Sequence, residues 1–334
     1  MSFKLKIWDH CRYVTNRERP YDEMARHLET MGKAGISSSI IYMPEVISLD
    51  DYCRAAKEAG LAVEARIFPA WGVKDPVLRT LPPEAWEEME KRFGIKLAGT
   101  CGNHPRNREG FLAAAEALAA EYAGRIEALH LDFIRNDNAL LLADYPCQCD
   151  ACQALYRRYF GCAVPTKELL RDPAVQYKLL ALRNENVRKT VVAMRALASR
   201  HGLKLTIAAR ANYVNSPDIT SPPVWGLGPA VLEGQDWVEW AEAGLVDGIC
   251  PMNYHTDLAL FEAVLADHLR LMGDRKELLF SGIGIVSSMG ETTPEGAARR
   301  LELVRNAGLP GAVFFNKTNV YGKEFLEVFR RFAR

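Results

Sequence analysis

The segment Glu127-Ala-Leu-His-Leu-Asp-Phe-Ile-Arg-Asn-Asp137 combines a strand-like pattern with a dense group of ionisable side chains. Residues two positions apart on a strand point to the same side, so His130 and Asp132 share a face, whereas the apolar Leu129, Leu131 and Phe133 share the other. An imidazole can donate a proton near neutral pH, and a carboxylate can accept one. The pattern predicts a catalytic strand end, and a buried His–Asp pair without chemistry is the alternative.

Strand-like and helix-like segments alternate along the whole chain. The predicted strands are Leu5–Asp9, Ser38–Met43, Leu61–Phe68, Glu127–Ile134, Lys204–Arg210, Gly248–Asn253, Glu277–Gly284 and Gly311–Asn316. The predicted helices are Tyr21–Ala34, Leu49–Ala59, Asn107–Tyr122, Ala174–His201, Gly234–Ala243, Leu258–Met272, Pro294–Ala307 and Lys323–Phe332. Strict alternation predicts parallel strands with right-handed crossovers. We therefore expect an α/β fold, a single (β/α)8 TIM barrel over residues 1–334 with long loops after strands three and four. A doubly wound sheet is the less favoured alternative, because no G-x-G-x-x-G turn follows the first strand.

The composition is that of a globular enzyme rather than a nucleic-acid or membrane protein. Lys plus Arg and Asp plus Glu are both 42, so the formal net charge is zero and argues against a nucleic acid or an anionic membrane as partner. No apolar run approaches the ~20 residues of a membrane span. The N-terminus has no signal-peptide pattern, so we expect a cytoplasmic protein whose eight cysteines are reduced.

Polar side chains follow the ends of the predicted strands, which a barrel gathers at one rim. The candidate site residues are Asp9, Glu45, Arg66, His130, Asp132, Arg135, Arg210, Asn253, Tyr254 and Asn316. Amides and carboxylates suit sugar hydroxyls, and nearby rings such as Trp71 and Trp225 suit sugar faces. Packing is the alternative interpretation of each aromatic residue, in particular Trp8 and Trp240.

Arginines occupy three successive strand ends, at Arg66, Arg135 and Arg210. The planar guanidinium group suits a carboxylate or a phosphate, so several together indicate an anionic group on the substrate. The alternative is that each arginine neutralises a nearby acid of the protein. The candidates for that role are Glu64, Asp132 and Asp137.

Strand parity predicts where the first and third strands direct their ionisable groups. Lys6 and Glu64 are expected to point into the barrel as a structural ion pair. On the first strand, Asp9 shares a face with Leu5 and Ile7, whereas His10 shares the face of Lys6. If the strand is regular to its end, only one of Asp9 and His10 points into the site.

Cysteines are concentrated in the loop after the fourth strand, as Cys147-Gln-Cys149-Asp-Ala-Cys152, with Cys162 ten residues further on. C-x-C-x-x-C has the spacing of thiolate metal ligands, but a second C-x-x-C or histidine pair is missing. We therefore expect no metal and no cofactor, with the thiols packing the loop. A structural zinc ion is the alternative.

These features together resemble the glycoside-hydrolase-like barrels, including glycosidases related to family 10-like barrels. The resemblance is carried by Leu129–Arg135, by Thr100–Arg108, by the cysteine-rich loop running into Ala154–Gly161, and by Asp236–Tyr254. Within that group the chain is similar to the inverting exo-sialidases of glycoside hydrolase family 156. That resemblance implies Asp9 as base to the attacking water and His130 as general acid, with Arg210 and Asn316 lining the site.

The expected function is therefore an exo-acting glycoside hydrolase for an acidic sugar. In this mechanism Asp132 orients or charges His130, or itself acts as an acid or nucleophile. The alternatives are a neutral-sugar hydrolase that uses Asp132 with Glu45, a non-catalytic carbohydrate-binding barrel, and a Schiff-base enzyme that uses Lys317. The expected partner is a small carbohydrate or glycoconjugate, and the sequence leaves a homo-oligomer open.

Overall fold

The computed structural model describes residues 3–9, 21–43, 48–94, 99–136, 145–213, 230–318 and 320–333, without the side chains of 92 and 93. Four of the residues singled out above, His10, Glu45, Asp137 and Trp225, lie outside the described residues.

Parallel strands form a barrel in the order predicted. They are β1 (Lys4–Asp9), β2 (Ile36–Tyr42), β3 (Ala62–Ile67), β4 (Ala128–Leu131), β5 (Lys204–Ala209), β6 (Gly248–Pro251), β7 (Phe280–Ser287) and β9 (Gly311–Asn316). The sheet order is β6-β5-β4-β3-β2-β1-β9-β7-β8, and a parallel bridge from Ile249 to Leu279 brings β6 to β7. The short β8 (Gly290–Glu291) pairs antiparallel with β7. The predicted (β/α)8 fold is confirmed.

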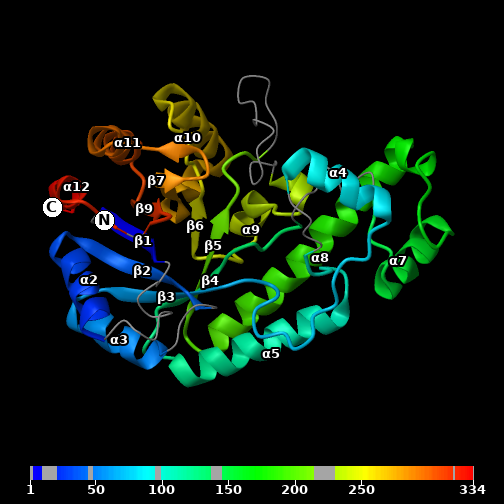
Figure 1. The fold of residues 1–334 in the computed structure, drawn as a ribbon, viewed down its shortest axis with the longest axis horizontal. Coiled ribbons are helices and arrows are strands. Elements are labelled where there is room, and N and C mark those ends of the chain that lie inside the picture. The colour runs from blue at the N-terminus through cyan, green and yellow to red at the C-terminus, as the bar shows by residue number, and fades with distance from the viewer. Residues whose placement is uncertain are drawn as a thin grey trace.

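Helices cover the outside of the strands (Figure 1). They are α2 (Tyr21–Lys33), α3 (Leu49–Glu58), α5 (Pro105–Tyr122), α8 (Pro173–Arg200), α9 (Trp237–Glu242), α10 (Leu258–Met272), α11 (Pro294–Asn306) and α12 (Lys323–Phe332). The two-residue period of each strand separates two cores. On β1, Leu5 and Ile7 pack in the core between strands and helices, whereas Trp8 packs inside the barrel.

The long loops after β3 and β4 contain helices that the sequence analysis did not predict. These are α4 (Pro83–Phe93), α7 (Asp150–Phe160) and the 3-10 turn η2 (Leu169–Arg171). Both α4 and α7 lie on the right of Figure 1, on the side away from β1. Helix α4 has proline in its first turn and ends at the left-handed Gly94, which are ordinary start and stop signals.

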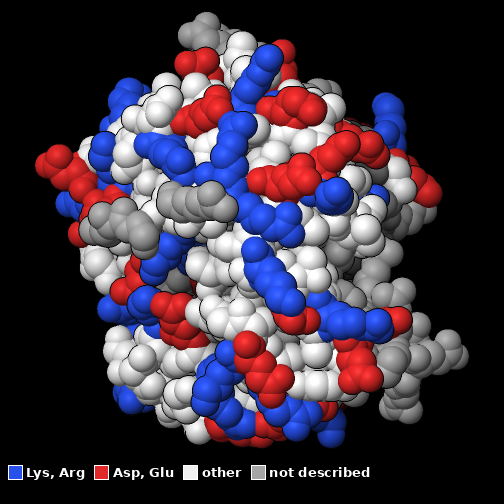
Figure 2. Space-filling view, turned by 90° about the vertical axis from the view of Figure 1, so that its left-hand side faces the viewer, with Lys and Arg blue, Asp and Glu red and all other residues white. Residues whose placement is uncertain are grey.

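Two expectations about the interior are confirmed. Trp8 and Trp240 are core residues, 2 % and 0 % exposed. Lys6 Nζ lies 2.6 Å from Glu64 Oε1 as an internal ion pair. On the outer surface beyond β1, acidic and basic side chains are intermixed (Figure 2). Within the described parts of the chain, no helix has the length and hydropathy needed to cross a membrane.

Candidate active site

Arginines and carboxylates alternate at the C-terminal ends of β3, β4 and β5, in a group that we call the rim cluster: Arg66, Asp132, Arg135, Glu233 and Arg210. Arg66 donates to Asp132 Oδ2 from Nε at 2.9 Å, with Nη2 at 2.6 Å. Arg135 lies between the two acids, with Nη1 3.8 Å from Asp132 Oδ1 and Nε 3.3 Å from Glu233 Oε2. Arg210 donates to both oxygens of Glu233, at 2.6 and 3.1 Å. The cluster therefore holds three cations and two anions.

The rim cluster is shielded from solvent, because its side chains are at most 8 % exposed. Burial alone raises the pKa of Asp132, but the charges of Arg66 and Arg135 outweigh burial and hold this pKa below its ordinary value. Asp132 is therefore ionised at neutral pH. This state suits a base, a nucleophile or a stabiliser of positive charge rather than a proton donor.

Glu233 is the member of the rim cluster that the sequence analysis missed. It ends the 3-10 turn η3 (Val231–Glu233), and Gly234 follows in the left-handed conformation. The available signal was an excess of arginines at adjacent strand ends, since buried arginines require acidic partners. Of the acids proposed for that role, Glu64 pairs with Lys6 instead, whereas Asp132 does pair with Arg66.

A cavity of about 620 Å³ opens beside the rim cluster, between the loops after β3 and β4 and helix α8. Its lining includes four aromatic residues and the polar Arg135 and Asn136; the aromatic residues are Tyr42, Phe68, Trp86 and Phe133. The Tyr42 ring lies 4.6 Å from the Arg66 guanidinium group, which joins the cavity wall to the cluster. The arrangement of ring faces next to fixed polar groups suits a sugar.

Phe133 adopts a backbone conformation that bulky residues rarely adopt, with φ of 51°. Its N–H donates to Asp132 Oδ1 at 2.7 Å, and its ring lies 4.6 Å from the Arg135 guanidinium group. Strained residues of this kind concentrate at functional sites. The strain turns the chain sharply after β4 and places Asp132 and Arg135 in one cluster.

His130 is buried beneath the rim, at 0 % exposure. Its Nε2 accepts a hydrogen bond from Trp8 Nε1 at 3.2 Å, and its Nδ1 lies 2.9 Å from Thr206 Oγ1. Thr206 in turn donates to Glu64 Oε2 at 2.6 Å. Burial lowers the pKa of His130 despite the nearby carboxylate of Glu64. In this geometry both ring nitrogens are engaged inside the barrel, by Trp8 and Thr206, and the role of His130 as general acid stays a prediction.

Asp9 faces the helices rather than the interior of the barrel. Its Oδ2 accepts from the Tyr52 hydroxyl at 2.6 Å and lies 3.8 Å from His27 Nε2. Tyr52 belongs to α3 and His27 to α2. The parity problem noted on the first strand is thus resolved against Asp9, because a regular strand turns its side chain away from His130. The structure does not bring the expected base and acid together.

The other predicted site residues contact groups outside the rim cluster. Asn253 donates to Phe261 O at 3.0 Å, and Asn316 donates to Val320 O at 2.7 Å. Tyr254 stacks on Phe315 inside the barrel, with ring centroids 5.1 Å apart. Trp71 packs against the core between strands and helices, and Lys317 is exposed. Arg66, Asp132, Arg135 and Arg210 are the predicted site residues that the structure brings together.

The fold and the rim cluster together define a (β/α)8 barrel with a charged group where barrel enzymes hold their active sites. No family model matches the sequence, and no curated protein matches it. Among solved structures, the glycoside hydrolase domain of PgaB (BpsB) from Bordetella bronchiseptica is similar over 98 % of this chain and 95 % of that one, with a TM-score of 0.69 and 12 % identity.

Two further solved structures share the architecture. The catalytic domain of β-amylase from Paenibacillus polymyxa has a TM-score of 0.60 and 11 % identity, covering 99 % of this chain and 97 % of that one. A chitinase from Chromobacterium violaceum has a TM-score of 0.52 and 10 % identity, covering 99 % of both chains. At these identities the likeness shows a fold that glycoside hydrolases use. The likeness to family 156 sialidases stays a prediction.

Proposed function

We propose that this protein is a glycoside hydrolase whose substrate carries an anionic group. The observation that carries the proposal is the rim cluster beside a cavity with aromatic walls, at the C-terminal ends of barrel strands. Catalytic residues of (β/α)8 enzymes occupy this end of the barrel. The solved structures that resemble the chain include a glycoside hydrolase domain, which supports the same class of reaction.

The charge balance of the rim cluster favours an acidic sugar. Arg66, Arg135 and Arg210 gather around Asp132 and Glu233, so three guanidinium groups lie together at one end of the barrel. Nη1 of Arg66 is buried and has no hydrogen-bond partner among the described residues. A buried donor in this state costs about 1–3 kcal/mol, and an anionic ligand would remove that cost. An exo-sialidase, whose substrate is a sugar carboxylate, is the narrowest form of the proposal.

The proposed chemistry uses two carboxyl groups, Asp132 and Glu233, on either side of the Arg135 guanidinium group. Most glycosidases place a pair of carboxyl groups across the scissile bond. The ionised Asp132 would take a proton from the attacking water, and Glu233, in its protonated form, would give a proton to the leaving oxygen as the glycosidic bond breaks. Glu233 here takes the role of second carboxyl group that the neutral-sugar alternative gave to Glu45. The Asp9 and His130 mechanism would require His130 to lose its hydrogen bond with Trp8.

The experiment is a comparison of Arg135→Gln with the unmodified protein on acidic and neutral aryl glycosides. Loss of the cavity-lining cation is expected to lower kcat/KM on the acidic glycoside at least tenfold, about 1.4 kcal/mol, with little change on a neutral one. The control is Arg188→Gln, because Arg188 forms a partly exposed ion pair with Glu239 on the outer helices. Activity confined to neutral glycosides, or an equal loss on both, would remove the acidic substrate.

A carbohydrate-binding barrel without catalysis is the alternative function, and two further measurements on the unmodified protein distinguish it. Titration calorimetry with the glycosides measures affinity, and product analysis over long incubation measures turnover. Binding without any product in the unmodified protein would refute the hydrolase.

A further inference from the structure

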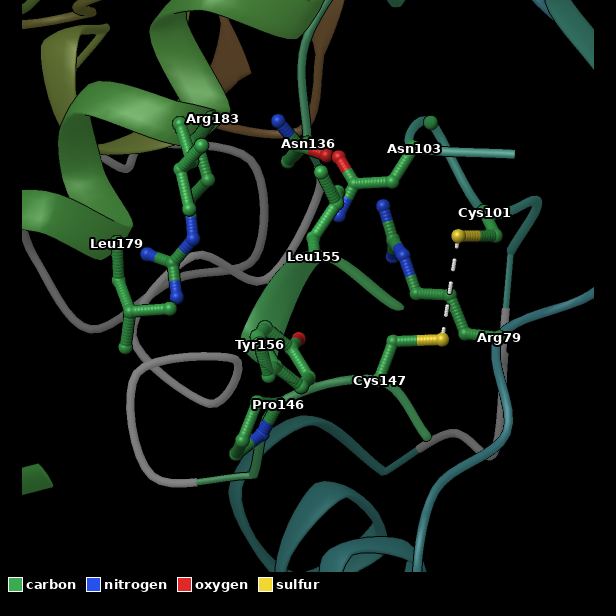
Figure 3. Close-up of a pocket in the computed structure, with 12 residues that line it drawn as sticks. Arg79, Cys101, Asn103, Asn136, Pro146, Cys147, Leu155, Tyr156, Leu179 and Arg183 are labelled. Carbon is green, nitrogen blue, oxygen red and sulfur yellow. Dashed lines mark hydrogen bonds between the residues drawn. The ribbon is translucent and has the colours of Figure 1, made fainter. Parts of the chain in front are cut away.

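Four cysteines from two separate loops lie close together, next to the loop residues that line the 620 Å³ cavity. Cys101 precedes α5, Cys147 and Cys149 lie in the loop after β4, and Cys152 lies in the first turn of α7. Their Sγ atoms all lie within 4.8 Å of one another. The Cys101 sulfur is 3.5 Å from those of Cys149 and Cys152 and 3.9 Å from that of Cys147. Figure 3 shows Cys101 and Cys147 directed toward each other.

We propose that these four cysteines bind a structural zinc ion. Zinc–thiolate bonds of about 2.3 Å place the sulfurs of a tetrahedral site about 3.8 Å apart, which agrees with the observed separations. A disulfide would require a separation of about 2.05 Å and would join only two of the four sulfurs. A complete set of four thiolates has no position left for a substrate, so the site is structural rather than catalytic.

The four thiols then act as metal ligands, whereas the sequence predicted thiols that only pack the loop. The fourth ligand is Cys101, not Cys162, which is half-buried and lies beyond the end of α7. The C-x-C-x-x-C motif supplies three of the four proposed ligands, and the fourth comes from the loop after β3.

The surroundings of the cysteines suit a negatively charged metal centre. Asn103 Nδ2 donates to Cys152 Sγ at 3.2 Å, as the outer partners of zinc thiolates do. Zinc with four thiolates is a dianion. Two arginines, Arg79 and Arg183, line the same small cavity as Cys101 and Cys147 (Figure 3). Their positive charges would offset that of the centre.

Backbone hydrogen bonds to residues 77–80 hold both of the loops that carry the cysteines. Cys101 N donates to Val77 O at 2.9 Å, and Gln148 N donates to Thr80 O at 2.8 Å. The loop after β3 also supplies Gly99, Thr100 and Gly102 to the wall of the 620 Å³ cavity. Zinc would therefore tie the loops after β3 and β4 together and hold this wall in place.

Metal analysis of the purified full chain, grown with zinc and kept reduced, tests the proposal without reference to activity. We expect one zinc per chain by elemental analysis and by native mass spectrometry. Cys101→Ser and Cys152→Ser should lose the metal, whereas the control Cys162→Ser should keep it. An unmodified protein without zinc, a mass lower by two hydrogens, or full zinc in Cys101→Ser would overturn the proposal.

A second measurement covers the case in which the serine variants do not fold. X-ray absorption at the zinc edge of the unmodified protein should give four sulfur neighbours at about 2.3 Å. Removal of zinc by a strong chelator should lower the Tm and make four buried thiols reactive. A coordination shell of nitrogen and oxygen, or a Tm unaffected by complete zinc removal, would contradict the structural site.

Discussion

Trp8 Nε1 donates a 3.2 Å hydrogen bond to His130 Nε2 inside the barrel. Because an indole nitrogen can only donate, His130 Nε2 must be the unprotonated nitrogen. The imidazole proton is then on Nδ1, facing Thr206, whose hydroxyl donates to Glu64. A neutral histidine thus connects Trp8, inside the barrel, to the internal ion pair of Lys6 and Glu64.

The first prediction is that His130 stays neutral in acid. Burial lowers its pKa below the ordinary 6.5, so the unfolded chain binds this proton first, and stability falls as the pH drops below that value. Nitrogen NMR at about pH 5.5, roughly one unit below the ordinary histidine pKa, should show the Nδ1–H form. The signal is assigned by its absence in His130→Gln. Protonation of both nitrogens near pH 6.5 would restore His130 as a candidate acid.

The second prediction concerns the internal ion pair. Glu64→Gln leaves Lys6 buried without its partner, so the free energy of unfolding should fall by about 3–5 kcal/mol in urea titrations. The control Glu29→Gln breaks an exposed pair with Lys33 and should cost less than about 1 kcal/mol. The double variant Lys6→Met/Glu64→Gln should recover much of the loss, because no buried charge is left unpaired. Equal effects of Glu64→Gln and Glu29→Gln would contradict this account.

The third prediction is a pH dependence that follows from the same carboxylate. Burial tends to raise the pKa of Glu64, but the charge of Lys6, whose Nζ lies 2.6 Å away, lowers it well below the ordinary 4.5. The contribution to stability is therefore complete above about 4.5 and is lost as the pH falls toward the lowered pKa. Urea midpoints measured from neutral to strongly acidic pH should fall more steeply for the unmodified protein than for Glu64→Gln. Parallel curves would show that Glu64 is not linked to acid unfolding.

The fourth prediction tests the proposed reaction. Asp132→Asn removes the ionised carboxylate and should lower kcat/KM on the best glycoside by at least about 100-fold. Because Arg66 loses its partner, Tm and circular dichroism must establish that the variant is folded. Asp51→Asn, at an exposed pair with Arg54, is the matched control. A folded Asp132→Asn protein with nearly full activity would exclude Asp132 from the chemistry.

The fifth prediction concerns the aromatic wall of the cavity. Trp86 extends from α4 and lines the cavity, so Trp86→Ala should raise KM or Kd for the glycoside about twofold to tenfold, the equivalent of about 0.5–1.5 kcal/mol for an aromatic contact. Tyr177→Ala is the control, since Tyr177 is 73 % exposed and is not among the lining residues. If the two variants bind the glycoside equally well, the sugar does not lie against Trp86.

Local patterns were sufficient to predict the barrel. The alternation of apolar residues and the glycines at helix ends depend on neighbours in sequence, so the eight strands and the outer helices were found within a few residues of their ends. The predicted fourth strand was too long at its end, because Phe133 leaves the extended conformation directly after β4. The helices α4 and α7 were hidden inside segments interpreted as loops, although Pro83 and Gly94 mark the ends of α4.

The sequence by itself determined the fold, the inward Lys6–Glu64 pair and the gathering of Arg66, Arg135 and Arg210 at one end of the barrel. Strand period turns Lys6 and Glu64 inward, and parallel strand order brings the strand ends that precede or carry the arginines together. Only the tertiary structure decided that Asp9 faces α2 and α3, that Glu233 completes the rim cluster and that Cys101 joins the other cysteines. These contacts join residues brought together by irregular loops or by packed helices. No local periodicity encodes the path of such a loop, so its partners become known only when the chain is folded.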